Sequence, residues 1–177
     1  MPNFRWVTIT DMAKSNVFSL PVRVYFQDTD AGGVVYHANY LNFMERTRTE
    51  WLRAHGYTNA GLMKEFGVVF VVRSMKLDYL KPAQLDDALE VTVQLKDIGR
   101  SRLTLLQTVR RQHGVAQQSG REPPLSTSPG SGGHYLHEAE VLRDELLTEA
   151  EVHLVCVSLE NFKPVSVPEV LRKKLQF

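Results

Sequence analysis

The residues Val22 to Arg53, VRVYFQDTDAGGVVYHANYLNFMERTRTEWLR, contain the pattern around which the rest of the chain is organised. Apolar and polar residues alternate from Val22 to Gln27, which predicts a short strand beginning after Pro21, where proline is tolerated. The next residues, Asp28 to Gly33, have turn chemistry, because aspartates bond to local amides and glycines adopt backbone angles that other residues resist. An amphipathic helix is expected to follow, so that strand, acidic turn and helix N-terminus meet within a short segment.

The helix is expected to run from Asn39, whose side chain can cap it, to Gly56, a residue type that commonly ends helices. Arg46 and Glu50 are spaced to form an i,i+4 pair on a solvent-facing side. Apolar residues recur at 4-3-4-3 spacing and predict the buried face. That face comprises Tyr40, Met44, Thr47, Trp51 and Ala54.

The remaining chain predicts mostly sheet. A short helix is expected at about 59–66, strands at 68–79, 89–96, 102–111 and 149–159, and a terminal helix at 168–175 behind Pro168. Residues 1–20 lack a clear period and are expected to form a loosely held lead-in. Residues 112–133 are rich in Gly, Pro and Ser and predict a mobile surface loop. Residues 134–147 are ambiguous between helix and hairpin, and the helical interpretation is favoured for 137–147.

One strand, one long helix and four further strands suggest an antiparallel sheet wrapped around the helix, in a single domain spanning 1–177 with a flexible insert at about 112–145. A sheet this small leaves a face or an edge uncovered, so we expect it to pair with another subunit.

Composition excludes several functions. The chain has 177 residues, 43% of them hydrophobic, which suffices for one sizeable core. Its net charge of +1 is too small to predict attraction to nucleic acid or to an anionic membrane. A single cysteine, Cys156, excludes an intrachain disulfide, fits a reducing cytosol and is interpreted as core. No signal-peptide pattern and no run of about 18 apolar residues is present, so we expect a cytoplasmic protein.

Asp30 is the first candidate for chemistry. Most turn aspartates are structural, and an Asx-turn is the ordinary interpretation. The placement of Asp30 beside a helix N-terminus suggests more, because unpaired backbone amides there can hold a carbonyl oxygen. Asp30 could then attack the adjacent carbon or activate water. No Ser-His-Asp or Cys-His pattern accompanies it, and a thiolate with a parent pKa near about 8.5 leaves without much help. The residues therefore favour thioester hydrolysis.

A family resemblance makes this expectation specific. Arg23-Val24 and the run TDAGGVVYHANY from Thr29 to Tyr40 closely resemble the active-site signature of the 4-hydroxybenzoyl-CoA thioesterase family. The QDTDAGGVVYH turn and the FMERTRTEWL helix look most like its YbgC branch of bacterial acyl-CoA thioesterases. Similarity extends from about Phe18 to Pro168, through FVVRSMKLDYLKPAQLDD and EAEVHLVCV, and lapses across 112–145. The resemblance implies an α+β hot-dog fold, dimers or tetramers, and an acyl-CoA substrate.

Site residues carry over from the resemblance to matching positions only. Asp30 takes the catalytic carboxylate, as nucleophile or general base, and the resemblance leaves that choice open. His37 would orient substrate or water with its side chain and polarise the thioester carbonyl with its backbone N–H, although a plain helix-entry residue is the alternative. Residues of the turn that would contact the substrate are Gly32, Gly33, Val34 and Tyr36, although the two glycines could equally be plain turn glycines that meet no ligand.

Three further groups of residues are candidates for a role in the site or in its structure. Glu45 is the rival nucleophile, because another branch of the fold places its carboxylate on the central helix; its ordinary interpretation is a helix-face glutamate bonded to Arg48 or Thr49. Asp28 is expected to be structural. The phosphates of CoA require basic partners. Arg100 and Arg102, on either side of a predicted turn, are favoured over Arg73, Lys76 and Lys81.

No metal and no cofactor is expected. Asp28 and Asp30 offer too few oxygen ligands for a hard cation, and His113, His134 and His137 are too loosely spaced for zinc. The resemblance also leaves room for a second kind of function. YbgC-like proteins are associated with the Tol-Pal envelope system, with acyl-carrier protein and with phospholipid-synthesis enzymes, so the chain could act mainly as an interaction protein with minor hydrolysis.

Overall fold

A computed structural model of the chain describes residues 17–112 and 145–176. Five strands form one antiparallel sheet in the order β1-β3-β4-β5-β2. The strands are β1 Val17–Arg23, β2 Val68–Tyr79, β3 Ala88–Ile98, β4 Arg102–Arg111 and β5 Glu145–Ser158. The helices are α2 Asn39–Ala54, α3 Asn59–Phe66 and α4 Glu169–Leu175, with a 3-10 turn, η1, at Phe26–Asp28.

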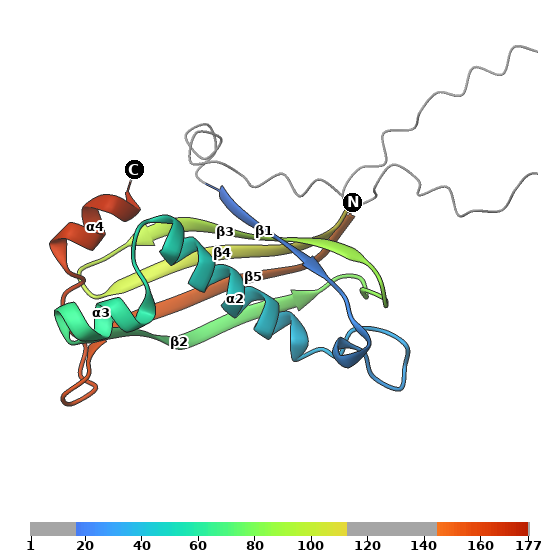
Figure 1. Cartoon of the computed structure of the whole chain (residues 1–177), viewed down its shortest axis with the longest axis horizontal. Helices are drawn as coiled ribbons and strands as arrows, with labels where there is room; N and C mark the ends of the chain where they lie inside the picture. The colour runs from blue at the N-terminus through green and yellow to red at the C-terminus, as the bar shows by residue number, and fades with distance from the viewer. Residues whose placement is uncertain (1–16, 113–144, 177) are drawn as a thin grey trace, which may run out of the picture.

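The long helix α2 lies across one face of the sheet (Figure 1). Its N-terminal end is close to the loop that follows β1, and α3 and α4 lie at the opposite end of the molecule. The α+β hot-dog architecture expected from the sequence, a sheet wrapped around a central helix, is confirmed. Within the described residues, none of the helices has the length and apolar character needed to cross a membrane.

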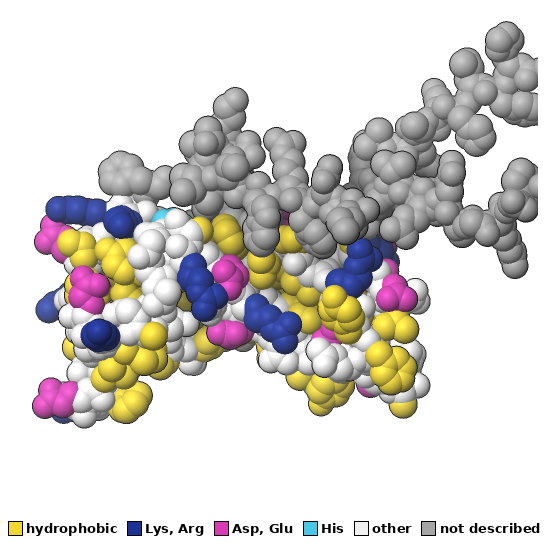
Figure 2. Space-filling view, in the orientation of Figure 1, with side chains coloured by type: hydrophobic (Ala, Val, Ile, Leu, Met, Phe, Trp, Pro, Cys, Tyr) yellow, Lys and Arg dark blue, Asp and Glu magenta, His cyan; other side chains and the backbone are white. Residues whose placement is uncertain are grey.

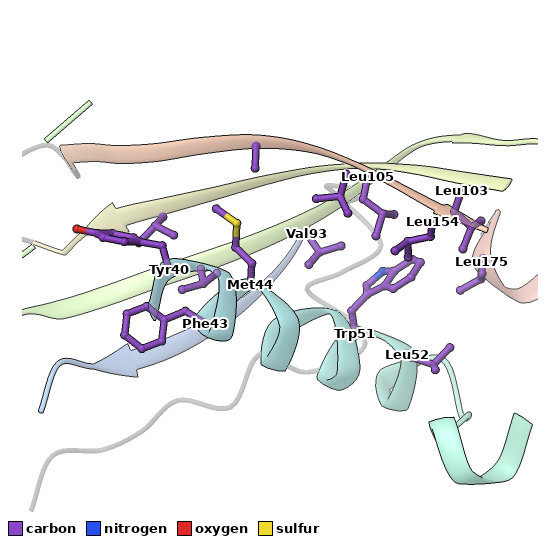
Figure 3. Packing of buried hydrophobic residues seen from close by; sticks show 14 of the residues in the cluster. Tyr40, Phe43, Met44, Trp51, Leu52, Val93, Leu103, Leu105, Leu154 and Leu175 are labelled. Atoms are coloured by element: carbon purple, nitrogen blue, oxygen red, sulfur yellow. The ribbon is translucent and has the colours of Figure 1, made fainter. Parts of the chain in front are cut away.

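The core lies between α2 and the sheet. Met44 and Trp51 extend from α2 toward Val93, Leu103 and Leu154 on the strands (Figure 3). The predicted buried face is confirmed at Tyr40, Met44, Thr47 and Trp51. It is wrong at Ala54, which is exposed, while Phe43 and Leu52 are buried in addition. The apolar stripe is therefore wider than one residue per turn, as is usual for a helix that a sheet curves around.

The N-terminal part of the sheet differs from expectation. Val17 to Leu20 were expected in the loose lead-in, but they pair with Gln94 to Val91 of β3. Pro21 lies inside β1, at the edge of the sheet, where a missing N–H is tolerated. The predicted strand through Gln27 is also wrong, since β1 ends at Arg23 and the chain turns into η1. Residues 1–16 lie outside the described residues.

The last strand also starts earlier than predicted. Glu145 pairs with Arg111 and Leu146 with Arg110, so the favoured helix is wrong for 145–147. The rest of that prediction, and the predicted loop at 113–133, lie outside the described residues. The expected bounds of α3, β2 and β4 match the structure, and α4 begins one residue after Pro168. The predicted pair of Arg46 with Glu50 is replaced by a contact between Glu50 and Arg53.

Candidate functional site

The acidic turn is a small hairpin of its own. The amide of Tyr36 donates to the carbonyl of Asp28 at 2.9 Å, and the amide of Asp30 donates to the carbonyl of Val34 at 3.0 Å. Between these two bonds, Thr29 and Val35 form an antiparallel bridge. The hairpin therefore holds Asp30 on one arm and delivers the other arm directly to the start of α2.

The two aspartates of the turn have different environments. Asp28 is 6% exposed, and its Oδ2 accepts a hydrogen bond from the amide of Tyr25 at 2.9 Å. The expectation that Asp28 is structural agrees with this contact. Asp30 is exposed, and its Oδ1 accepts a bond from the amide of Gly32 at 2.8 Å. That bond is an Asx-turn, and it leaves the second carboxylate oxygen of Asp30 without a partner among the described residues.

The remaining turn residues support the hairpin. Gly33 has a positive φ of 74°, a backbone conformation that glycine adopts without a steric cost. Val34 bridges to Gln84, so its backbone is held by a distant loop. Tyr36 is exposed, and its ring lies 4.3 Å from the ring of His37, centroid to centroid.

The start of α2 presents unpaired backbone donors. Asn39 was expected to cap the helix, but it is the first helical residue and Ala38 occupies the cap position without a side-chain bond. The side chain of Asn39 instead donates from Nδ2 to the carbonyl of Asp28 at 3.0 Å. Within the described residues, the amides of His37, Ala38 and Tyr40 have no acceptor. An oxygen with partial negative charge would be stabilised there.

Two of these three residues, His37 and Tyr40, line an open cavity of about 300 Å³. Its lining is largely apolar and aromatic and consists of Val35, His37, Tyr40, Tyr79, Leu80, Lys81 and Pro82. The hydroxyl of Tyr79 donates to the carbonyl of His37 at 2.9 Å, which fixes the residue before the cap of α2 to β2. Burial raises the pKa of Tyr79, so this donor stays protonated at neutral pH.

The opposite wall of the cavity comes from the segment after β2. The amide of Ala83 donates to the hydroxyl of Tyr40 at 2.8 Å, and the carbonyl of Ala83 accepts from the amide of Val35 at 2.9 Å. Sequence reasoning assigned Tyr40 to the core and gave Tyr79, Leu80 and Pro82 no role in a site. The available signal was the FVVRSMKLDYLKPAQLDD run within the resemblance, which contains all three residues but carried no role for any of them.

Glu45, the rival nucleophile, lies further along α2. Its Oε1 accepts from the hydroxyl of Thr49 at 3.0 Å, which is the ordinary interpretation of this residue. Both line a second cavity of about 140 Å³ that does not include the residues of the first. Arg48 reaches into the same cavity and donates to Gln107 at 2.7 Å. Burial lowers the pKa of Arg48, and the charge of Glu45 opposes that shift.

Arg100 and Arg102, the favoured partners of the CoA phosphates, lie away from this end of the molecule, whereas Lys81, a less favoured candidate, lines the cavity. Arg100 donates from Nε to the Ser166 hydroxyl at 2.9 Å. Arg102 and Arg73 line a cavity of about 450 Å³. Arg102 of β4 and Val71 of β2 both pair with Val155 of β5, so they lie at the same height in the sheet. Tyr79 of β2 and Val109 of β4 both pair with Thr148, nearer the other end. The strand from Arg102 to Val109 spans roughly 23 Å at about 3.3 Å per residue. One copy of the chain therefore does not bring Arg102 beside His37.

Charge on the visible surface is mixed. Figure 2 shows basic and acidic side chains interspersed with hydrophobic ones over the face that carries α2, where described residues are visible. Cys156 is buried on the inner face, as predicted, and burial raises the pKa of its thiol to about 11. It is therefore protonated and not a nucleophile at neutral pH. In the described ranges, no group of three potential metal-ligating side chains occurs.

Comparison with protein families gives one match across most of the chain. Residues 24–175 match the Thioesterase-like superfamily. A protein named acyl-CoA thioesterase YbgC from Haemophilus influenzae is 37% identical over 158 residues, which cover 89% of this chain and 93% of that protein. The acyl-CoA thioester hydrolase YbgC of Escherichia coli O6:H1 is 37% identical over 155 residues, covering 88% and 92%.

Solved structures agree on the fold. A probable thioesterase from Bartonella henselae has a TM-score of 0.64 and 29% identity, with 86% of this chain and 99% of that chain covered. A 4-hydroxybenzoyl-CoA thioesterase mutant complexed with 4-hydroxybenzoyl-CoA has a TM-score of 0.70 at 18% identity, covering 91% and 99%. The second likeness concerns the fold alone.

Proposed function

The chain belongs to the thioesterase-like superfamily and is a thioesterase, and from this premise we propose that it hydrolyses acyl-CoA to a free acid and CoA with Asp30 as the catalytic carboxylate. The observation that supports this most is the set of unpaired amides at His37, Ala38 and Tyr40, which open beside an apolar cavity and follow the Asp30 hairpin directly. Donors fixed where negative charge develops are among the largest contributions to catalysis of acyl transfer.

In the proposed mechanism, the thioester carbonyl oxygen accepts hydrogen bonds from the unpaired amides at the start of α2. The acyl group occupies the cavity between Tyr40, Tyr79 and Pro82, whose lining is mostly apolar. Asp30 then attacks the carbonyl carbon or removes a proton from an attacking water. The C–S bond breaks, and CoA leaves as a thiolate that needs little protonation, because its parent pKa is near about 8.5.

The two proposed roles of Asp30 differ in whether an oxygen atom of the hydrolytic water can enter the Asp30 carboxylate. As a nucleophile, Asp30 forms an anhydride with the acyl group, and hydrolysis of that anhydride at the Asp30 carbonyl carbon transfers a water oxygen into the carboxylate. As a general base, Asp30 gains no oxygen. A single turnover in ¹⁸O-labelled water, followed by mass spectrometry of the peptide that contains Asp30, separates the two: label in the peptide supports the nucleophile and excludes the general base.

Binding of CoA is proposed to require more than one copy of the chain. Arg100 and Arg102 are the proposed partners of the CoA phosphates, and Arg102 is separated from His37 by most of the length of β4. We propose a dimer or tetramer in which the basic residues of one copy serve the Asp30 of another. The free edge at β2 agrees with such pairing, since it leaves backbone groups unpaired within the described residues.

The substrate class is tested with a panel of acyl-CoA thioesters that vary in chain length and include aromatic acyl groups, each compared with the matching oxygen ester. Turnover of thioesters faster than that of the matching esters is expected, because a thiolate leaves without protonation whereas an alkoxide of much higher parent pKa does not. Turnover of no acyl-CoA would instead favour an interaction protein, for which acyl-carrier protein, phospholipid-synthesis enzymes and the Tol-Pal system are the proposed partners. Binding of the chain to acyl-carrier protein in that case would support the alternative.

A further inference from the structure

The segment Leu80–Asp87, which connects β2 to β3, is held from both sides. Towards the site, Ala83 bonds to Tyr40 and Val35, as described above, so the segment contacts both the first turn of α2 and the arm that follows Asp30. These two contacts set the spacing between the acidic hairpin and the helix start. Whatever fixes the segment from its other side therefore also fixes the site.

Arg111, the last residue of β4, makes contacts on that other side. Its Nη2 donates to the carbonyl of Pro82 at 2.7 Å, and its Nε donates to Oδ2 of Asp87 at 2.8 Å. Oδ2 of Asp87 also accepts from the amide of Gln84 at 2.7 Å, which closes the segment on itself. The guanidinium therefore bonds to the segment on both sides of Ala83.

Arg111 is itself fixed by β5. Its Nη1 donates to Glu145, which also accepts from Lys81 at 2.6 Å. The Arg111 side chain is 20% exposed, so these charged contacts are largely shielded from water. The planar guanidinium can satisfy three acceptors at fixed angles at once, which a lysine ammonium on a flexible stem cannot reproduce.

We infer that Arg111 is a positioning residue for the thioesterase site: by bonding to Pro82 and Asp87 it holds the Leu80–Asp87 segment, and through Ala83 it fixes the spacing between the Asp30 hairpin and the N-terminal amides of α2. Arg111 touches no reacting atom in this account. The inference rests on the proposed function, because positioning has a kinetic consequence only if that hairpin and those amides act together.

The test compares Arg111→Gln and Arg111→Lys with Arg110→Gln, at the preceding residue of β4, because successive side chains of a strand lie on opposite faces of the sheet. We expect Arg111→Gln to lower kcat about 10- to 100-fold with KM changed less than about 3-fold, because misplacement affects the transition state more than binding. Arg111→Lys should lie between the wild type and Arg111→Gln, and Arg110→Gln should match the wild type.

A double variant tests whether Arg111 and Tyr40 act through the same segment, because two independent structural roles would give multiplied losses in kcat. Tyr40→Phe removes the hydroxyl that accepts the Ala83 amide, so it loosens the Leu80–Asp87 segment on the side opposite to Arg111. If both residues act through the segment, Arg111→Gln combined with Tyr40→Phe should lower kcat no more than the larger single effect. Multiplied effects would overturn the inference. If Arg111→Gln does not fold, the folded Arg111→Lys variant takes its place in the same double comparison.

Hydrogen exchange separates failure of this inference from failure of the proposed function. The amides of Val35 and Ala83 should exchange faster in the Arg111 variant, while the amides in the middle of β3 stay protected. Faster exchange with unchanged kcat would overturn the positioning role and leave the thioesterase mechanism standing. Unchanged exchange at Val35 and Ala83 would also overturn it. If the Arg111 variant exchanges faster but the separate Asp30→Asn variant keeps full activity, the positioning contacts are real and the assignment of Asp30 as the catalytic carboxylate is wrong.

Discussion

The side chain of Asn39 donates to the backbone carbonyl of Asp28 at 3.0 Å, and this contact joins the first residue of α2 to the acidic hairpin. The same carbonyl accepts the amide of Tyr36. The Asp28 carbonyl thus bonds both to the second arm of the hairpin, at Tyr36, and to the first residue of α2. The contact matters for function because the proposed mechanism requires Asp30 and the helix amides to act on one carbonyl group.

Asn39→Ala should lower kcat/KM about 10-fold, because the hairpin can then shift relative to α2. The cost in stability should be small: one hydrogen bond contributes about 1 kcal/mol, and alanine returns about 0.7 kcal/mol of helix propensity. Steady-state kinetics and urea unfolding measure the two effects. Asn42→Ala is the matched control, since Asn42 is exposed one turn later and, among the described residues, its side chain donates to Asn39 alone, so its loss leaves the bond to Asp28 in place. Equal kinetic losses in the two variants would contradict the role of the contact.

The two turn glycines should respond differently to alanine. A Cβ on Gly32 would lie 3.0 Å from Oδ1 of Asp30, whereas Gly33 has open space but a φ of 74°. Gly32→Ala should therefore displace the carboxylate and lower kcat/KM about 10-fold with little change in stability. Gly33→Ala should lower the free energy of unfolding by about 1–2 kcal/mol through backbone strain. Kinetics beside thermal unfolding distinguish them, and the reverse order of effects would exclude this assignment.

A buried polar contact links α2 to the sheet. Gln107 is fully buried, accepts from Arg48 at 2.7 Å and donates to the carbonyl of Met44 at 3.1 Å. Gln107→Leu should lower the free energy of unfolding by about 2–3 kcal/mol, because it leaves the half-buried guanidinium without its acceptor. Adding Arg48→Met removes that charge and should restore about 1 kcal/mol. Denaturant unfolding of both variants checks this, and a double variant less stable than the single one would refute it.

Glu145 should make stability depend on pH. Its hydrogen bond from Lys81, followed by the charges of Lys81 and Arg111, holds the pKa of this carboxyl below its ordinary value in the folded state. A lowered folded pKa contributes stability above the unfolded pKa, and this contribution is lost as pH falls through the folded pKa. Glu145→Gln should therefore flatten the loss of stability that sets in as pH falls below the ordinary glutamate pKa of about 4.3. Parallel curves for wild type and variant would contradict the ion pair.

Much of this fold could be predicted from sequence, and the failures have physical reasons. The bounds of α3, β2 and β4 were set by local signals, namely alternation and flanking glycines. The strand at Val17 to Leu20 was missed because an edge strand is half-buried on both faces and shows no clean alternation. The start of β5 was missed because Glu145 and Leu146 extend the strand by pairing with Arg111 and Arg110 of β4, a long-range contact that no local pattern signals.

For the site, the sequence placed the acidic turn next to the helix start, and the structure has it there. The role of Asn39 could not be predicted, since its partner is the carbonyl of Asp28 and not a neighbouring amide. The residues from Tyr79 to Pro82 lie far from His37 in the sequence, and only the folding of the sheet brings them beside it, so local patterns could not predict this wall of the cavity. The separation of Arg102 from His37 follows from strand register, which the sequence did not specify.

The central claim, that Asp30 acts on a thioester held by the amides at the start of α2, is tested most directly by single-turnover release of CoA from a bound acyl-CoA. Wild type, Asp30→Asn and Glu45→Gln are compared at saturating enzyme. We expect Asp30→Asn to lose at least about 100-fold in rate while still binding the substrate, and Glu45→Gln to stay within a few-fold of wild type. An Asp30→Asn variant that releases CoA at the wild-type rate, or a Glu45→Gln variant that carries the whole loss, would contradict it.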